Sequence, residues 1–231
     1  MPRTHAVRAV LELRRRIVSG ELPGGARLYE VPLAETLLIS RTPLREAMAR
    51  LAEEGLLERA RGGYVVRTFR YADIVDAIEL RGVLEGTVLR LAAERGPDRE
   101  RFEAMRAIAG EIDACLRLTD ESDAFAAYFE ANTRFHNQLA GLAGSVVLER
   151  EVVRISRLPF AAPSASLPDR TYFAEHRPAF EVAQGHHRAM IAAVAAGQGS
   201  RAEHLGREHA LHALSDLQSV LRSRGIEPGT A

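Results

Sequence analysis

Hydrophobic side chains recur at helical spacing through most of the chain, and the stretch near residues 56–69 departs from this pattern. The first apolar positions fall three and four apart and stop at Gly20, a residue type that commonly ends helices. Two short strand-like segments are joined through Arg61-Gly62-Gly63, which predicts a hairpin with glycines at its tip. The predicted elements of this part are helices over 4–19, 32–38 and 40–55, an extended piece over 27–29, and strands over 56–60 and 64–69. Three helices followed by a hairpin are typical of a winged helix-turn-helix.

From Tyr71 onward the pattern is helical and no strand is predicted. Glycine and proline interrupt it at Gly96-Pro97, at 141–144 and at 197–199. The predicted helices of this part are 72–95, 98–119, 122–142, 144–157, 171–197 and 200–223. The fold is therefore expected to be mainly α. An N-terminal winged helix-turn-helix domain over 1–70 precedes a C-terminal all-helical bundle over 71–231.

The helix predicted over 40–55 carries positive charge at an end that disfavours it. Ser40 is a candidate N-cap, and the arginines at 41 and 45 lie four apart on one face. Arginine at a helix N-terminus is unfavourable unless an anion approaches it. In a helix-turn-helix this end enters the DNA major groove, where Arg41 and Arg45 could each donate two hydrogen bonds to a guanine. The alternative is an ordinary solvated helix in which Arg45 pairs with acids.

Other residues near this helix fit a DNA-binding surface. Thr42 and Ser40 could reach a phosphate or a thymine methyl group, and Arg50, further along the helix, is expected to meet phosphate. Arg61 at the hairpin tip could enter the minor groove, where Gly62 allows close approach of the backbone.

Charge is divided unevenly between the two parts, although the net charge of the chain is zero. Residues 1–70 hold 13 arginines and 8 acids, whereas residues 71–231 hold 18 and 23. A basic first part fits a polyanionic partner, although chance could produce the same asymmetry. The single Cys115 cannot form an internal disulfide, and no signal peptide or membrane-spanning run is evident. A cytoplasmic protein is therefore expected.

Three of the eight histidines occupy positions that indicate a common site. Asn132 and His136 lie four apart on one helix face that also carries apolar side chains. His187 and His209 lie on the last two long predicted helices, beside apolar residues. Histidines that converge from different helices inside a bundle are a common way to bind a first-row metal. The alternative is that each is an ordinary core or surface histidine.

The first part of the chain resembles a known family of DNA-binding proteins. The stretch "IVSGELPGGARLYEVPLAETLLISRTPLREAMARLAEEGLLERARGGYVV" is similar to the N-terminal domain of the GntR family of bacterial transcription regulators, most clearly in "SRTPLREA" and the glycine hairpin. The resemblance covers residues 7–70. One departure is Val31, where some members carry a further DNA-contacting arginine. The positions that the resemblance assigns to DNA contact are Ser40, Arg41, Thr42, Arg45 and the Arg61-Gly62 tip.

Residues 71–223 resemble the FCD domain, the helical ligand-binding domain of the FadR branch of this family. The supporting stretches include "NTRFHNQLAGLAGS" and "HHRAMIAAVAAGQGSRAEHLGREHA". Members with a metal usually have an aspartate four residues before a histidine, followed by two more histidines on the last long helices. The ligands implied for zinc or nickel are Asn132, His136, His187 and His209.

Asn132 stands at the position where the aspartate is usual. Its amide oxygen is a weaker ligand, so metal is expected to bind less tightly, while an occupied site would attract a carboxylate more strongly. In the resembling domain the "ELR" arginine often points into the ligand cavity, which makes Arg81 a candidate effector contact. The alternative is a surface pair of Arg81 with Glu85, four residues on.

The expected function is a ligand-responsive transcription regulator rather than an enzyme. It would be a homodimer that reads a palindromic double-stranded DNA operator, acting as a repressor in the bacterial cytoplasm at the nucleoid, without a membrane partner. The effector would be a small organic acid. One alternative is a metal-sensing regulator. A histidine-ligated metalloenzyme is a weaker one, because no glutamate is placed as a general base in the HExxH manner.

Overall fold

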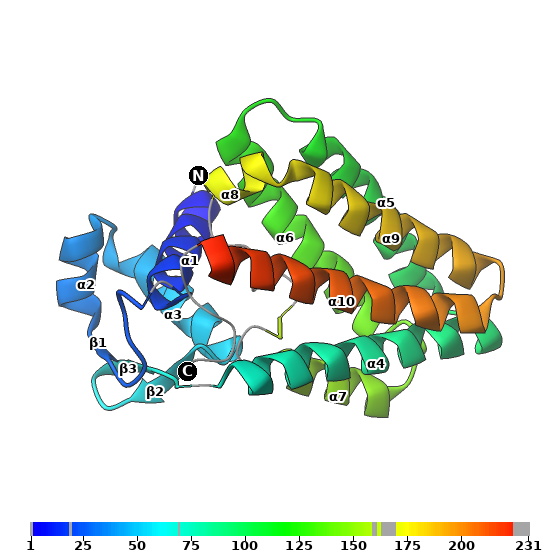
Figure 1. Cartoon of the computed structure of the whole chain (residues 1–231), viewed down its shortest axis with the longest axis horizontal. Helices are drawn as coiled ribbons and strands as arrows, with labels where there is room; N and C mark the ends of the chain where they lie inside the picture. The colour runs from blue at the N-terminus through cyan, green and yellow to red at the C-terminus, as the bar shows by residue number, and fades with distance from the viewer. Residues whose placement is uncertain (1, 19, 69, 159–160, 163–169, 224–231) are drawn as a thin grey trace.

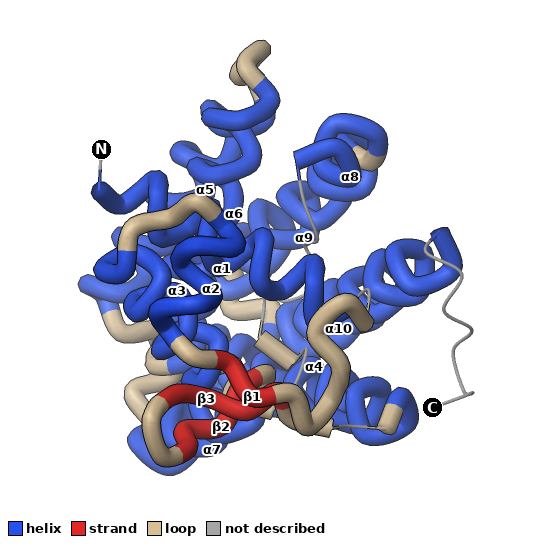
Figure 2. Tube along the Cα trace, turned by 90° about the vertical axis from the view of Figure 1, so that its left-hand side faces the viewer, coloured by secondary structure: helices blue, strands red, loops and turns tan. Residues whose placement is uncertain are grey.

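The structure is a computed structural model, and it describes residues 2–18, 20–68, 70–158, 161–162 and 170–223. The predicted end of the first helix at Ser19 and of the last strand at Phe69 lie outside these residues. The N-terminal elements are α1 (Pro2–Val18), β1 (Arg27–Leu28), α2 (Glu30–Leu37), α3 (Arg41–Glu53), β2 (Leu57–Ala60) and β3 (Gly63–Val66). Figure 2 shows the three strands side by side at one edge of the helices. Their order is β1-β3-β2, and both pairings are antiparallel.

Local sequence determines where α3 begins and ends. Ser40 takes the extended conformation of an N-cap, although its side chain makes no capping hydrogen bond. Gly55 follows the helix with a φ of 72°, a conformation that favours glycine. The apolar face of α3 is fully buried through Leu44, Met48 and Leu51. The winged helix-turn-helix expected from the sequence is therefore present.

The second part is entirely helical in the residues that the structure describes. Its elements are α4 (Tyr71–Arg95), α5 (Arg99–Leu116), α6 (Glu121–Ala140), α7 (Val146–Ile155), α8 (Arg170–Glu175), α9 (Arg177–Ala195) and α10 (Gly199–Ser223). Figure 1 shows α4 and α10 crossing the bundle side by side. Three glycines allow this approach, because a Cβ atom on Gly82, Gly86 or Gly206 would lie under 3.0 Å from atoms of the facing helix. The predicted mainly α fold is confirmed.

One predicted helix is divided in two. The sequence pattern predicts a single helix over 171–197, whereas the structure ends α8 at Glu175 and begins α9 at Arg177. His176 between them has non-helical backbone angles, and Pro178 lies in the first turn of α9. Proline has no N–H to donate and is tolerated in the first turn of a helix, so it favours a new start at this point.

The winged helix-turn-helix packs directly on the helical bundle. Arg14 of α1 is fully buried, forms an ion pair with Glu54, and lies 5.2 Å from the ring centroid of Phe129 of α6. A Cβ atom on Gly55 would lie 1.9 Å from the carbonyl oxygen of Arg157, which follows α7, so the two parts approach too closely for another residue there. Every helix in the described ranges is too short or too polar to cross a membrane.

Candidate functional site

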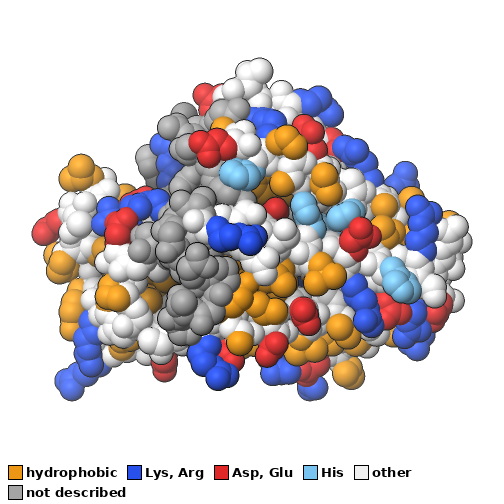
Figure 3. Space-filling view, viewed as in Figure 1, with side chains coloured by type: hydrophobic (Ala, Val, Ile, Leu, Met, Phe, Trp, Pro, Cys, Tyr) orange, Lys and Arg blue, Asp and Glu red, His pale blue; other side chains and the backbone are white. Residues whose placement is uncertain are grey.

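Three helices bring the three predicted histidines together inside the bundle. His136 of α6, His187 of α9 and His209 of α10 are all buried, and one ring nitrogen of each lies within 4.8 Å of the others. The Nε2 atoms of His136 and His209 are 3.2 Å apart. Four histidines outside this cluster, at 176, 186, 204 and 212, are less buried, and Figure 3 shows several pale-blue side chains on the surface. The cluster is thus an internal feature and not a chance grouping of surface residues.

Glu85 of α4 fixes the orientation of the first histidine. Its Oε1 atom lies 3.0 Å from Nδ1 of His136, and both side chains are almost completely buried. Burial by itself would raise the pKa of Glu85, but the nearby charges of His136 and Arg81 lower it below its ordinary value. If Nδ1–H of His136 donates a hydrogen bond to the Glu85 carboxylate, the Nε2 lone pair of His136 faces the other two histidines.

Gln184 fixes the orientation of the second histidine, His187. Its Nε2 atom donates to the carbonyl oxygen of Ala109 and to Asp113, both at 2.7 Å. Its Oε1 atom is therefore the acceptor for Nδ1 of His187 at 3.0 Å. This leaves Nε2 of His187 as a buried lone pair, with no hydrogen-bond partner among the described residues. Burial also lowers the pKa of both His187 and His209 well below the ordinary histidine value, which favours the neutral form that binds metals.

These observations fit a bound divalent metal. Two nitrogens that bind the same zinc ion at about 2.0–2.1 Å in a tetrahedral site lie roughly 3.3 Å apart. The distance between the Nε2 atoms of His136 and His209 is close to this value. The carboxylate behind His136 and the amide behind His187 are the kind of outer partners that metal-binding histidines have. Asn132 is buried one turn before His136 on α6, so its amide belongs to the same region.

Arg81 adds a positive charge beside the cluster. Its side chain is only 2 % exposed, and its Nη1 atom lies 3.8 Å from Oε1 of Glu85. Two of its nitrogens, Nε and Nη1, have no hydrogen-bond partner within the described residues. The charge of Arg81 is also close enough to contribute to the lowered pKa of His209, where burial is the main cause. A guanidinium with unused donors in a buried site is suited to bind an anion.

Sequence reasoning missed Glu85 and Gln184 as parts of this site. The sequence presents Glu85 as half of an i, i+4 pair that could equally lie on the surface, and its contact with His136 spans 51 positions. Gln184 does have a signal, because it lies one turn before His187 on the same helix.

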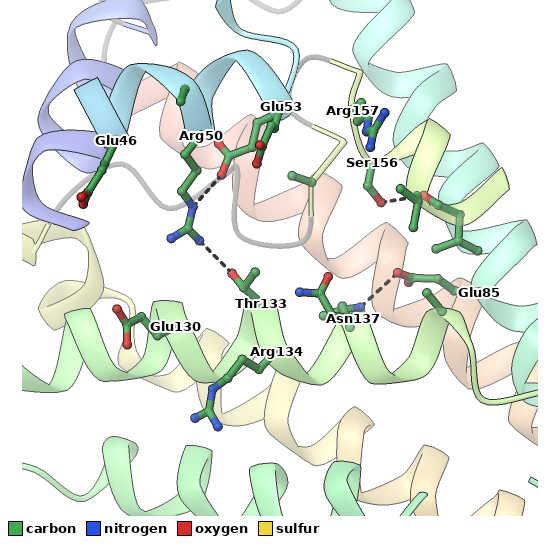
Figure 4. Close-up of a pocket in the computed structure, with 17 residues that line it drawn as sticks. Glu46, Arg50, Glu53, Glu85, Glu130, Thr133, Arg134, Asn137, Ser156 and Arg157 are labelled. Atoms are coloured by element: carbon green, nitrogen blue, oxygen red, sulfur yellow. Dashed lines mark hydrogen bonds and ion pairs between the residues drawn. The ribbon is translucent and has the colours of Figure 1, made fainter. Parts of the chain in front are cut away.

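A large cavity leads to this cluster from the winged helix-turn-helix. It has a volume of about 1010 Å³ and lies between α3, α6 and α7. Glu85 and His136 line its inner end, and α3 contributes Arg50 and Glu53 to its wall. Figure 4 shows Arg50 pointing across the cavity toward Thr133 of α6. The cavity therefore touches both the histidine cluster and α3.

The exposed end of α3 holds the predicted DNA-binding arginines. Arg41 and Arg45 have side chains that are 61 % and 59 % exposed. Arg45 donates to Glu30 of α2 from Nε at 3.0 Å and from Nη2 at 2.7 Å, and Arg41 lies 3.9 Å from the same carboxylate. Ser40 and Thr42 are exposed beside them. The structure thus gathers these residues on one surface, with a glutamate between the two arginines.

The other predicted DNA contacts lie in two different places. Arg61 and Gly62 form the exposed turn between β2 and β3, where Gly62 has a φ of 83°. Arg50 instead lies at the contact between the two parts of the chain. Its Nη2 atom donates to the hydroxyl of Thr133 at 3.3 Å, and its guanidinium lies 4.5 Å from the ring centroid of Phe129. In this arrangement the side chain of Arg50 is engaged in contacts with α6 of the helical bundle.

Two family profiles match separate parts of the chain. The profile described as "Bacterial regulatory proteins, gntR family" matches residues 5–66, and the profile described as "FCD domain" matches residues 76–212. The second match alone covers more than half of the chain.

Individual proteins similar to this chain are also described as transcription regulators. The chain is 34% identical over 206 residues to a probable D-xylose utilization operon transcriptional repressor of Paenarthrobacter nicotinovorans, covering 84% of this chain and 80% of that protein. It is 38% identical over 153 residues to the Nta operon transcriptional regulator of Aminobacter aminovorans, covering 62% and 67%. Among solved structures, E. coli McbR/YncC matches with a TM-score of 0.60 at 19% identity, covering 94% of this chain and 98% of that one. That likeness supports the fold.

Proposed function

Because the chain belongs to the GntR family of bacterial regulators and carries an FCD domain, it is a DNA-binding transcription regulator, and we propose that a small organic acid bound at the buried histidine cluster controls it. The observation that carries this proposal is the position of Arg81, a buried guanidinium with unused donors beside three converging histidines. A carboxylate would satisfy those donors. The family assignment supports the expectation of a regulator over an enzyme.

A divalent metal, zinc or nickel, would be held by His136, His187 and His209 together with the amide oxygen of Asn132. Such an ion supplies a positive charge with open coordination positions for an acidic ligand. Glu85 and Gln184 keep the Nδ1 protons of two histidines in place, so that their Nε2 atoms stay available. Arg81 binds and orients the carboxylate from its own side of the site.

DNA is bound through the exposed surface at the start of α3 and through the turn of the hairpin. Arg41 and Arg45 read guanine bases in the major groove, with Ser40 and Thr42 beside them, while Arg61 and Gly62 approach the minor groove. A homodimer presents two such surfaces to a palindromic operator. Relatives described as operon repressors support repression as the sign of control. The protein would act at the nucleoid in the bacterial cytoplasm.

Helix α6 provides a physical route from the effector site to the DNA-binding part. Phe129 and Thr133 contact Arg50 of α3, and one turn further His136 reaches the cluster. Because these residues share one face of a single helix, a shift of α6 on ligand binding moves the surface on which α3 rests. The effector regulates DNA binding if it prefers one of the two resulting arrangements.

The test combines ligand binding with DNA binding. Thermal shift with a panel of small carboxylates should show stabilisation, and a ligand at about 100 times its Kd adds about 2.7 kcal/mol. The same hit should weaken operator binding in a fluorescence-anisotropy titration, and chelator should abolish both effects. Unchanged operator affinity in the presence of a saturating carboxylate would contradict the proposal. A response to metal alone would instead assign the protein as a metal sensor.

A matched pair of variants tests the DNA surface. Arg45→Ala removes one base contact and should weaken operator discrimination by about 1–3 kcal/mol, or roughly 5- to 150-fold. Arg106→Ala removes an exposed arginine of α5 that pairs with nearby Glu103, and it should bind the operator like the unaltered protein. Equal affinities of the two variants would remove Arg45 from the DNA interface.

A further inference from the structure

Leu38, the residue that ends α2, has a backbone conformation that is unfavourable for its residue type. Its φ of 53° and ψ of 37° lie in the left-handed region. Within the part of the chain that the structure describes, it is the single non-glycine residue with a positive φ. In this region the Cβ atom of an L-residue comes too close to the following carbonyl oxygen, whereas glycine has no Cβ and takes the conformation freely. Leucine therefore strains the backbone at this position.

The side chain of Leu38 does not compensate for this strain by packing. It is 93 % exposed, which is the largest exposed fraction among the large hydrophobic side chains of the described residues. Almost none of its apolar surface is therefore removed from water. The turn itself is held by backbone hydrogen bonds, from Leu38 N–H to Glu35 at 3.3 Å and from Ile39 N–H to Ala34 at 3.1 Å, which glycine could make equally well. The stability of the free protein thus gives no reason for a leucine here.

The position of Leu38 suggests where its side chain is used. It lies in the turn that joins α2 to α3, two residues before the N-cap Ser40, and two residues of chain span at most about 7 Å. The exposed Arg41 and Thr42 follow directly. Figure 1 shows α2 at the edge of the molecule, remote from α9. A partner that approaches the start of α3 therefore meets Leu38 as well.

We propose that Leu38 is a specificity-determining residue that packs against the methyl group of a thymine in the operator. This inference rests on the DNA surface described under the proposed function, and it adds a contact that uses no hydrogen bond. The bases present hydrogen-bonding groups to the major groove, and the C5-methyl group of thymine is the apolar group among them. Because a leucine side chain has neither a donor nor an acceptor, thymine is the base whose edge it recognises. The contact removes both apolar groups from water.

This role makes opposite predictions for stability and for DNA binding. Leu38→Asn relaxes the backbone, because asparagine takes the left-handed conformation more readily, but it removes the apolar contact. The thermal midpoint of the free protein should stay equal or rise, whereas operator affinity in a fluorescence-anisotropy titration should fall about five- to tenfold. Leu38→Met keeps an apolar side chain and should keep most of the affinity. Weaker binding by a variant that is at least as stable cannot result from unfolding.

Replacement of single thymines identifies the base partner. An operator duplex is first selected from a random library with the unaltered protein, and each thymine is then replaced in turn by deoxyuridine, which lacks only the C5-methyl group. At one thymine in each half-site the replacement should weaken binding of the unaltered protein about three- to fivefold. The same replacement should have no effect on binding of Leu38→Asn, because the side chain that contacts the methyl group is already absent.

Two further variants separate this contact from the DNA surface as a whole. Leu118→Asn makes the same substitution at an exposed position after α5 and should leave operator affinity unchanged. If Arg45→Ala weakens binding but Leu38→Asn does not, the role of Leu38 is wrong while the proposed DNA surface stands. If neither variant weakens binding, both proposals fail. Deoxyuridine effects that are the same in Leu38→Asn as in the unaltered protein would overturn the thymine contact.

Discussion

The exposed surface at the start of α3, which we propose binds DNA, and the buried histidine cluster each contain a glutamate from a neighbouring helix, but the two glutamates have opposite surroundings. Glu30 of α2 accepts hydrogen bonds from Arg45 at a site where the arginine is 59 % exposed. Glu85 of α4 contacts His136 and Arg81, and its side chain is 1 % exposed. Both glutamates have a lowered pKa, yet the hydrogen bond from Arg45 is the main cause for Glu30, whereas for Glu85 partner charges overcome burial.

This difference indicates what each pair can do. Water and salt screen an exposed pair, so Arg45 can exchange the Glu30 carboxylate for a DNA phosphate or base at little net cost. A buried pair cannot exchange its partners for water, and removing one member leaves the other uncompensated. The arginines at the start of α3 can therefore change partners readily, whereas the partners within the buried cluster are fixed.

The largest expected effect comes from neutralising the buried glutamate. Glu85→Gln keeps the size of the side chain but leaves the charge of Arg81 uncompensated in the interior, and it should lower the free energy of unfolding by about 3–5 kcal/mol. Helix α4 offers a matched control in Glu94→Gln, which alters an exposed Arg90–Glu94 pair of the same i, i+4 spacing. That change should cost less than about 1 kcal/mol. Urea denaturation followed by circular dichroism measures the free energy of unfolding of both variants. Equal decreases in the two variants would contradict the difference between the buried and the exposed pair.

The sequence predicted the elements whose causes are local. The start of α3 at Ser40, its buried stripe and its stop at Gly55 are all encoded within one short stretch, so they could be predicted from spacing and residue type. The same holds for the hairpin, whose glycines mark the turn. The break at His176 was missed because Pro178 is compatible with the first turn of a new helix as well as with a continuous apolar pattern.

Parts of the candidate site could not be predicted, because they depend on contacts between distant segments. The position of Arg50 on α3 predicts a phosphate contact, yet the packing of the two parts against each other places its side chain against Phe129 and Thr133. Glu85 presents the pattern of a surface pair with Arg81, and only the packing of α4 against α6 shows that it is buried. Residue type indicated the histidines, and tertiary structure identified their partners.

A second variant sharpens the comparison by adding charge to the buried site. Asn132→Asp introduces a carboxylate beside the three histidines, and it should tighten the binding of zinc or nickel about tenfold or more, because a charged oxygen is a better ligand than an amide. Competition with a chromophoric chelator measures this change. The same charge should weaken carboxylate binding in the metal-loaded protein, since less positive charge remains for the effector.

His204→Asp is a suitable control for that experiment. His204 is exposed on α10 outside the cluster, so an added carboxylate there should leave both metal and effector affinity unchanged. Unaltered metal affinity of Asn132→Asp would remove residue 132 from the ligand set, while the three histidines would remain.

The smallest expected effect comes from neutralising the exposed glutamate. Glu30→Gln frees Arg41 and Arg45 from their shared partner and removes a negative charge from the surface proposed to bind DNA. Binding to non-operator DNA should become a few-fold tighter, because the salt-dependent attraction of arginines for phosphate does not depend on sequence. The ratio of operator to non-operator affinity should fall, since Arg45 loses the contact that orients it. Glu35→Gln on the same helix removes an equal charge from an exposed position. Anisotropy titrations at several salt concentrations compare the two variants, and an unchanged affinity ratio in Glu30→Gln would show that Glu30 does not orient Arg45 for base recognition.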